Sequence, residues 1–222
     1  MSGDHDHEHG HDHGHDESAG TPARHPFQPD IEDAPFDDYQ LMAQAVGEIL
    51  IDKGVFNADD LRRTIEKIDA ITPALGARVV ARAWTDAAFR RRLLADVNAA
   101  AAEMGIDAGT IPIRAVANGP DLHNVIVCTL CSCYPRQLIG LPPDWYKSRA
   151  YRSRVVREPR AVLAEFGATL APDIAINVHD STADLRYMVL PMRPKGTEGL
   201  DEDALARLVT RDSMVGVAVI DR

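Results

Sequence analysis

Cysteine is scarce in this sequence and confined to one place. The 222 residues contain three cysteines, all within the hexapeptide CTLCSC at 128–133. Three thiols cannot pair completely, and disulfides rarely persist in cytosolic proteins, so a disulfide framework is excluded. Metal binding, thiol redox chemistry and core packing remain as explanations for this concentration of thiols.

Long hydrophobic runs and excess basic charge are also missing. No apolar segment approaches the roughly 18 residues of a membrane-spanning helix, and the His- and Asp-rich beginning is unlike a secretory signal peptide. We therefore expect a cytoplasmic protein without a membrane partner. The net charge of −10 argues against nucleic acid as the main partner, because phosphate binding requires a basic surface.

The first 36 residues have the composition of a disordered segment. MSGDHDHEHGHDHGHDESAG holds almost no apolar side chains, so burial cannot offset the entropy of ordering it. We predict a disordered His-rich tail and linker over 1–36. The alternating His and acidic residues are typical of loose divalent-metal binding, but a solvated tail or part of an expression tag has the same composition.

Residues 37–108 are predicted to form a helical arm. Apolar residues recur at helical spacing, but few are large, so we expect this arm to pack on another subunit. The predicted helices cover 39–53, 58–71, 73–84 and 86–97. Their start signals are Asp37 or Asp38, Asn57, Pro73 and Thr85, and Gly54 ends the first.

Residues 109–222 mix short strands with short helices. We predict strands at 111–116, 124–127, 173–180, 185–191 and 214–220, with the third and fourth paired across a turn. Helices are expected at 148–156, 159–167 and 202–209. Because the pattern lacks βαβ regularity, the expected fold class is α+β.

The cysteines follow the spacing C-x-x-C-x-C, at Cys128, Cys131 and Cys133. If the amides of Ser132 and Cys133 lose their protons, residues 131–133 can surround an ion with two sulfurs and two nitrogens in a plane. Cys128 can then cap the plane and leave a sixth position open. Deprotonated amides require a strongly Lewis-acidic ion, such as trivalent cobalt or iron, whose open position polarises a bound group.

Spacing alone leaves other sites open. A closed zinc site would need His123 or a distant residue as its fourth ligand, because structural zinc usually has two separated ligand pairs. His123 is more typical of a structural histidine. A closed iron–sulfur site or three packed thiols also fit the spacing. A C-x-x-C redox pair is a further alternative, although Cys133 crowds it and no thioredoxin-like unit surrounds it.

The stretch VCTLCSCYPRQLIGLPPDWYKSRAYRSRVV resembles the α subunit of nitrile hydratases. The resemblance continues through REPRAVLAEFG, LRYMVLPMRPKGTEG and LVTRDSMVGVAV, and it covers about 40–219. It implies a lyase that hydrates a small-molecule nitrile to an amide. It also implies an N-terminal helical arm that wraps a β-type subunit, followed by a layered α/β/β/α catalytic domain. The implied active site lies at the subunit interface.

The resemblance further implies a low-spin cobalt(III) or iron(III) centre, inserted with help from a metallochaperone or activator. Thr129 matches the residue found at this position in the cobalt class, whereas the iron class usually has Ser. Cobalt is therefore the expected metal, and iron is less favoured. Cys131 is expected as a sulfinate and Cys133 as a sulfenate. The implied metal ligands are the sulfurs of Cys128, Cys131 and Cys133 and the backbone nitrogens of Ser132 and Cys133.

One departure from the family pattern affects the substrate. Arg136 stands where nitrile hydratases usually have Trp. In this position the sequence is similar to thiocyanate hydrolase, the sister enzyme, which has an Arg there. A guanidinium near the metal attracts an anion, or hydrogen-bonds a polar nitrile. Against thiocyanate, Gln137 replaces the Pro expected in both groups, and GLPPDWYKS is similar to nitrile hydratase.

We therefore predict the metal-bearing subunit of a cobalt nitrile hydratase. Cys133, Ser132 and Arg136 are the expected catalytic residues, with the Cys133 sulfenate oxygen as nucleophile or base. Thiocyanate hydrolase, which releases carbonyl sulfide and ammonia, is the alternative enzyme. A non-catalytic metal carrier is the second alternative, and it predicts an exchangeable divalent ion and unoxidised thiols.

Overall fold

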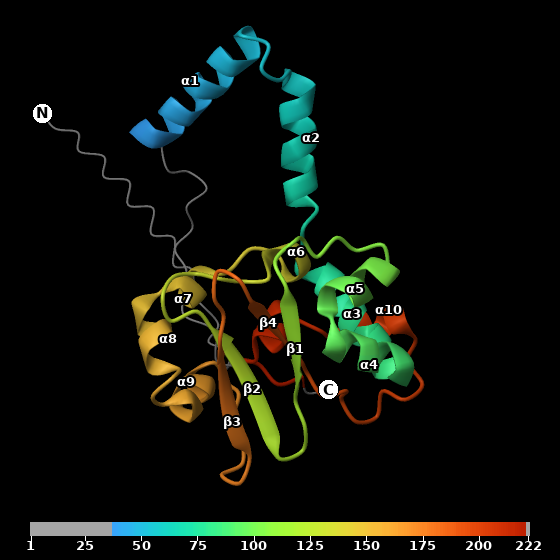
Figure 1. Cartoon of the computed structure of the whole chain (residues 1–222). Coiled ribbons are helices and arrows are strands. Elements are labelled where there is room, and N and C mark those ends of the chain that lie inside the picture. Colours follow the sequence, from blue (N-terminus) through green and yellow to red (C-terminus); the bar gives the residue numbers. More distant parts are fainter. Residues whose placement is uncertain (1–36, 221–222) are drawn as a thin grey trace, which may run out of the picture.

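The computed structural model describes residues 37–220 and has the expected α+β class. The predicted disordered tail, 1–36, lies outside this range. Figure 1 shows two helices, α1 and α2, that project from a body in which helices flank two small pairs of strands. Among the described residues, no helix is long and apolar enough to cross a membrane.

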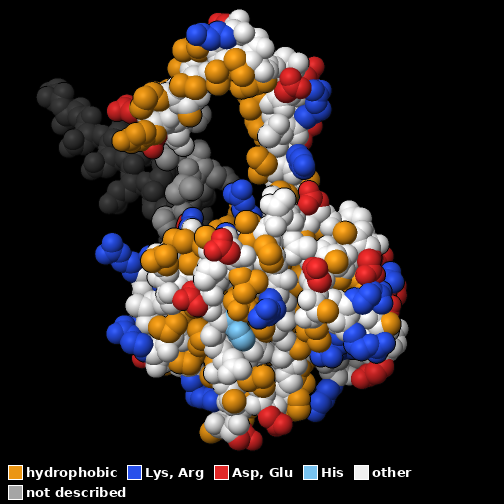
Figure 2. All heavy atoms as spheres, viewed as in Figure 1, with side chains coloured by type: hydrophobic (Ala, Val, Ile, Leu, Met, Phe, Trp, Pro, Cys, Tyr) orange, Lys and Arg blue, Asp and Glu red, His pale blue; other side chains and the backbone are white. Residues whose placement is uncertain are grey.

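The two projecting helices begin at the residues that the sequence indicates. Asp37 caps α1 (Asp38–Asp52) and Asn57 caps α2 (Ala58–Asp69), each through a reciprocal pair of side-chain and backbone hydrogen bonds. Neither helix contains a buried residue. Figure 2 shows hydrophobic side chains along the concave side of this arm. The exposed ones include Leu41, Met42, Val46, Ile49, Leu61, Ile65 and Ile68.

The next three helices belong to the packed body. Helices α3 (Pro73–Thr85), α4 (Ala87–Ala95) and α5 (Val97–Glu103) all carry buried residues, and α4 and α5 pack against strand β1. The prediction that Thr85 caps the fourth helix is wrong. Asp86 is the cap, because its carboxylate accepts hydrogen bonds from the amides of Ala88 and Phe89. The division between arm and catalytic domain at residue 108 stays a prediction.

The strands form two parallel pairs. β1 (Ile113–Ala117) pairs with β4 (Arg186–Leu190), and β2 (Leu122–Val127) pairs with β3 (Ala175–Asp180). The predicted pairing of the third and fourth strands with each other is wrong. The turn between them closes, with the amide of Thr182 donating to the carbonyl of Leu185, but the two strands then join different partners.

Short helices surround the strand pairs. Figure 1 shows α8 (Arg149–Arg154) and α9 (Pro159–Glu165) beside β2 and β3, with α3, α4 and α5 on the opposite side of the body, beside β1. Helices α6 (Arg136–Ile139) and α7 (Asp144–Lys147) follow the cysteine segment, and α10 (Glu202–Ala206) packs against α3. This arrangement fits the predicted helix–strand–strand–helix layers.

The predicted final strand at 214–220 is wrong. Thr210 and Ser213 form a reciprocal capping pair that starts helix α11 (Arg211–Val215) instead. Gly216 then ends the helix with a φ of 91°, a left-handed conformation that favours glycine. Met214, Val215 and Val217 are buried by packing against the body and not by strand pairing, whereas Val219 is exposed.

Five aromatic residues form a cluster beneath the cysteine segment. Tyr146 packs edge-on to Tyr134 with ring centroids 4.9 Å apart, and Trp145 packs in the same way on Tyr151 and Phe166. All five rings are buried. Rings lose few rotamers on packing and bury a large apolar area, so this cluster gives the cysteine segment a rigid base.

Candidate metal centre

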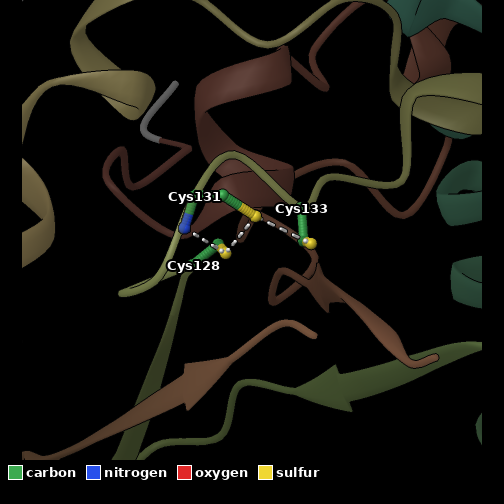
Figure 3. Close-up of side chains that lie close together, drawn as sticks. All are labelled: Cys128, Cys131 and Cys133. Atoms are coloured by element: carbon green, nitrogen blue, oxygen red, sulfur yellow. Dashed lines mark hydrogen bonds between the residues drawn. The ribbon is translucent and has the colours of Figure 1, made fainter. Parts of the chain in front are cut away.

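The three cysteines converge on one point at the carboxyl end of β2. The sulfurs of Cys128 and Cys131 lie 3.5 Å apart, those of Cys131 and Cys133 lie 3.3 Å apart, and all three are within 4.8 Å of one another (Figure 3). The amide of Cys131 also points at the sulfur of Cys128, at 3.2 Å. The segment therefore folds back on itself and brings three sulfurs close enough together to bind one ion.

Burial differs among the three thiols. Cys128 is fully buried, Cys133 is partly buried and Cys131 is exposed. Hydrogen bonds from Cys133 and Cys128 lower the pKa of the Cys131 thiol to about 7, whereas burial and the adjacent thiols raise the pKa of Cys133 to about 12. A bound multivalent cation would let all three thiols ionise, because metal binding competes with protons for thiolates.

No fourth side chain joins the cysteines in the described part of the chain. His123, the candidate fourth ligand for zinc, is buried within β2 and directs its Nε2 at the carbonyl of Gly216, 2.7 Å away. Three sulfurs without a fourth His, Cys, Asp or Glu do not form a closed structural zinc site. The arrangement fits an ion that draws further donors from the backbone.

Side chains from other elements hold the segment in place. Asp180, the last residue of β3, accepts hydrogen bonds from the amide of Thr129 at 2.9 Å and from its hydroxyl at 2.6 Å. From below, the hydroxyl of Tyr146 donates to the carbonyl of Cys133 at 2.9 Å. Sequence reasoning missed Asp180. Pairing β3 in parallel with β2 would have placed it opposite Val127, beside the cysteine segment.

Removal of the Asp180 carboxylate should weaken metal binding. Asp180 holds Thr129 in place, and Thr129 lies between Cys128 and Cys131 in the chain. Asp180→Ala removes both of these hydrogen bonds. We therefore expect cobalt affinity to fall about 10- to 100-fold, as it does when other residues that hold metal ligands are replaced. Metal titration of the assembled complex measures this. Asp184→Ala, which removes an exposed carboxylate in the following turn, is the matched control. Equal affinities for the two variants would contradict the role of Asp180.

A pocket of about 640 Å³ opens over the cysteines. Cys131, Ser132 and Cys133 form one wall, and Ser132 is exposed. We call the cysteine segment, residues 128–133, the claw. Arg136 lines the same pocket as the claw, together with Lys147 and Arg186, two cations that sequence reasoning missed. The remaining walls come from Tyr134, Pro135, Gln137, Leu141, Pro142, Ile113 and residues 108–111. The described lining therefore has three cationic side chains and no carboxylate.

A second histidine, His179, also has a structural setting. Its Nε2 lies 2.8 Å from the side-chain oxygen of Asn124, and its ring is tilted over Tyr187. Burial lowers the pKa of both His123 and His179. Burial therefore favours the neutral form of both rings.

Acid should destabilise the fold through these histidines. Because the pKa of His123 is lowered from 6.5, the unfolded chain takes up a proton that the folded chain does not. The contribution of His123 to the free energy of unfolding is thus complete above pH 6.5. It is lost as pH falls further, at up to about 1.4 kcal/mol per pH unit. Denaturant unfolding at several pH values should show a smaller acid loss for His123→Gln than for the parent. Identical losses would contradict this.

The comparison with known protein families shows to which family the chain belongs. Residues 37–218 match the family model described as nitrile hydratase, alpha chain. The chain belongs to the nitrile hydratase α chain family. This match includes the cysteine segment, its anchors Asp180 and Tyr146, and both projecting helices, so the site and the arm belong to one family-wide unit.

Individual relatives carry two enzyme names. The chain is 51% identical over 178 residues to the low-molecular weight cobalt-containing nitrile hydratase subunit alpha of Rhodococcus rhodochrous, covering 79% of this chain and 86% of that relative. It is 43% identical over 194 residues to the thiocyanate hydrolase subunit gamma of Thiobacillus thioparus, covering 82% and 80%. A recombinant thiocyanate hydrolase with partially modified cobalt centres superimposes with a TM-score of 0.76 at 40% identity, covering 84% and 94%.

Proposed function

We propose that this chain is the metal-bearing α-type subunit of a cobalt nitrile hydratase, which hydrates a nitrile to the corresponding amide. The convergence of three sulfurs within 4.8 Å, with Cys131 and Cys133 lining an open pocket, carries the proposal. Membership of the nitrile hydratase α chain family and the cobalt named for a relative support it.

The donor set fits a trivalent ion. Cys128, Cys131 and Cys133 supply thiolates, and the backbone nitrogens of Ser132 and Cys133 lie between the last two sulfurs in the chain. When bound, cobalt(III) supplies Lewis acidity at an open coordination position, a role that leaves its oxidation state unchanged. Iron(III) fits the same donors, but Thr129 and the cobalt relatives favour cobalt.

The chain's own residues orient the reactants. Cys133, oxidised to a sulfenate, presents an oxygen to the pocket that serves as base or nucleophile, and Cys131 is its sulfinate neighbour. The exposed hydroxyl of Ser132 hydrogen-bonds water there, and Arg136 holds the polar end of the substrate. Hydration consumes one water: its two O–H bonds and two of the three carbon–nitrogen bonds of the nitrile break, a C=O double bond and two N–H bonds form in the amide, and no electrons are exchanged.

The projecting arm supports a protein partner. Helices α1 and α2 have no buried residue and carry large exposed apolar side chains, a surface that soluble chains normally cover. We propose one or more β-type subunits on this arm and over the open pocket, with a cobalt activator for metal insertion. The assembled enzyme is cytoplasmic and takes a small nitrile, without nucleic acid or membrane.

Co-expression with the β-type partner and cobalt tests the proposal. The assembled complex should convert neutral nitriles to amides, whereas this chain alone should not. Amide formation is followed by chromatography, with an apo complex as control. A cobalt-loaded complex that hydrates no nitrile would contradict the proposed activity.

Thiocyanate hydrolysis is the second candidate, favoured by the cations of the pocket. Arg136, Lys147 and Arg186 line it, and one nitrogen of the Arg186 guanidinium is buried without a hydrogen-bond partner among residues 37–220. These charges suit an anion. One thiocyanate and two waters would give carbonyl sulfide, ammonia and hydroxide. Turnover of thiocyanate but of no neutral nitrile would replace the first proposal by this one.

A further inference from the structure

The side chain of Gln137 occupies space that a side chain at position 109 would otherwise fill. A Cβ added to Gly109 would lie 2.9 Å from Cγ of Gln137 and 3.6 Å from its Cβ and Cδ. Real Cβ atoms essentially never come within 3.0 Å of another group, so a larger residue at 109 would displace Gln137. Gly109 also has a φ of 80°, which favours glycine independently.

The segment that contains Gly109 is held firmly. Asn98 of α5 donates its side-chain amide to the carbonyls of Gly109, at 2.9 Å, and Ile111, at 3.1 Å. Its side-chain oxygen accepts from the amide of Ile113 at 2.8 Å. Residues 109–113 therefore form a fixed wall, and Gln137 lies against this wall at the position of the missing side chain.

This placement puts the side-chain amide of Gln137 in the pocket. Gln137 is partly exposed and lines the same pocket as Cys131, Ser132 and Cys133. Within residues 37–220 its side-chain amide makes no hydrogen bond, although it can donate two and accept two. Arg136 precedes it and also lines the pocket. The wall beside the claw thus offers hydrogen-bond donors.

We propose that Gln137 is a specificity-determining residue whose amide hydrogen-bonds an acceptor group on the substrate, at the end remote from the nitrile. The inference rests on the proposed function and narrows its substrate class to nitriles with a hydroxyl, carbonyl or carboxylate substituent. Gly109 contributes by leaving room for the Gln137 side chain along the wall.

The first test compares two nitriles of equal size. Wild-type and Gln137→Leu complexes, each assembled with partner and cobalt, are assayed with 3-hydroxypropionitrile and with butyronitrile. Leu retains the volume of Gln but cannot hydrogen-bond. The ratio of kcat/KM for the hydroxylated over the apolar nitrile should fall about 3- to 10-fold, the effect of one hydrogen bond. The loss should appear mainly in KM, as expected for uniform binding. An unchanged ratio would overturn the proposal.

A double-mutant cycle tests the role of Gly109 independently. Gly109→Ala should reduce the same ratio in the parent, and should reduce it less in a Gln137→Ala background, which has no γ atom to obstruct the added Cβ. Gly105→Ala is the matched control, because Gly105 also has a positive φ, 70°, but has no neighbour within 4 Å. Equal effects of Gly109→Ala in both backgrounds would contradict the contact-based role.

Binding measured without turnover separates this inference from the proposed function. Saturation-transfer NMR of 3-hydroxypropionamide and butyramide, the two product amides, reports discrimination by Gln137 even in a complex that hydrates nothing. Discrimination without hydration would refute the proposed reaction but keep the role of Gln137. Hydration without discrimination would refute the role of Gln137 alone.

Discussion

Cys131→Ala should remove cobalt from the assembled complex and abolish nitrile hydration. Cys131 is the central sulfur of the claw: it lies 3.5 Å from the sulfur of Cys128 and 3.3 Å from that of Cys133. Its loss leaves Cys128 and Cys133 without the sulfur between them. It also removes one of the four proposed in-plane ligands, which are the sulfurs of Cys131 and Cys133 and the backbone nitrogens of Ser132 and Cys133. Even outer-shell changes lower metal affinity 10- to 100-fold, so we expect a loss of more than about 100-fold here. Elemental analysis and the hydration assay measure it.

Ser132→Ala is the matched control for this substitution. It keeps the backbone nitrogen of Ser132, which is the proposed ligand, and removes only an exposed hydroxyl. This variant should therefore retain cobalt while its rate of hydration falls. Loss of cobalt from Ser132→Ala, or full retention in Cys131→Ala, would contradict the proposed donor set.

Gly216→Ala should be the most destabilising of the glycine substitutions. A Cβ at this position would overlap the carbonyl oxygen of Asn124 and lie 2.9 Å from Cα of Val125, both in the backbone of β2. Backbone within a paired strand cannot move aside without breaking the sheet. With the added strain of a φ of 91°, we expect a loss of about 3–5 kcal/mol in the free energy of unfolding.

Gly167→Ala is the control that separates backbone strain from steric overlap with β2. Gly167 has a similar φ, 85°, but no neighbour within 4 Å, so its substitution should cost only about 1–2 kcal/mol. Thermal and denaturant unfolding of both variants gives the comparison. Equal losses would show that backbone conformation alone is measured and that α11 does not pack tightly on β2.

Local signals in the sequence predicted most of the elements correctly. Asp37 and Asn57 each have a capping partner three residues later, and Gly54 and Gly167 end helices with positive φ, so these boundaries depend on near neighbours only. The cysteine claw has the same advantage. Its three thiols span six residues, so their convergence needs only one turn of chain.

Pairings between distant segments could not be predicted in this way. The strands at 175–180 and 186–190 are joined by a short turn, which favours a hairpin, yet each has a parallel partner elsewhere. This error hid Asp180, because its place beside Thr129 depends on the β2–β3 register. Arg186 and Lys147 were missed for the same reason, since they meet Arg136 only through the tertiary fold.

Cobalt content and cysteine oxidation, measured on the complex purified with its partner, test the central claim most directly. Elemental analysis with peptide mass spectrometry over 128–133 should find one cobalt per chain, two added oxygens on Cys131 and one on Cys133. Unoxidised thiols with an exchangeable divalent ion would contradict a catalytic centre and indicate a metal carrier. X-ray absorption with four sulfurs in a tetrahedron would contradict the claw itself.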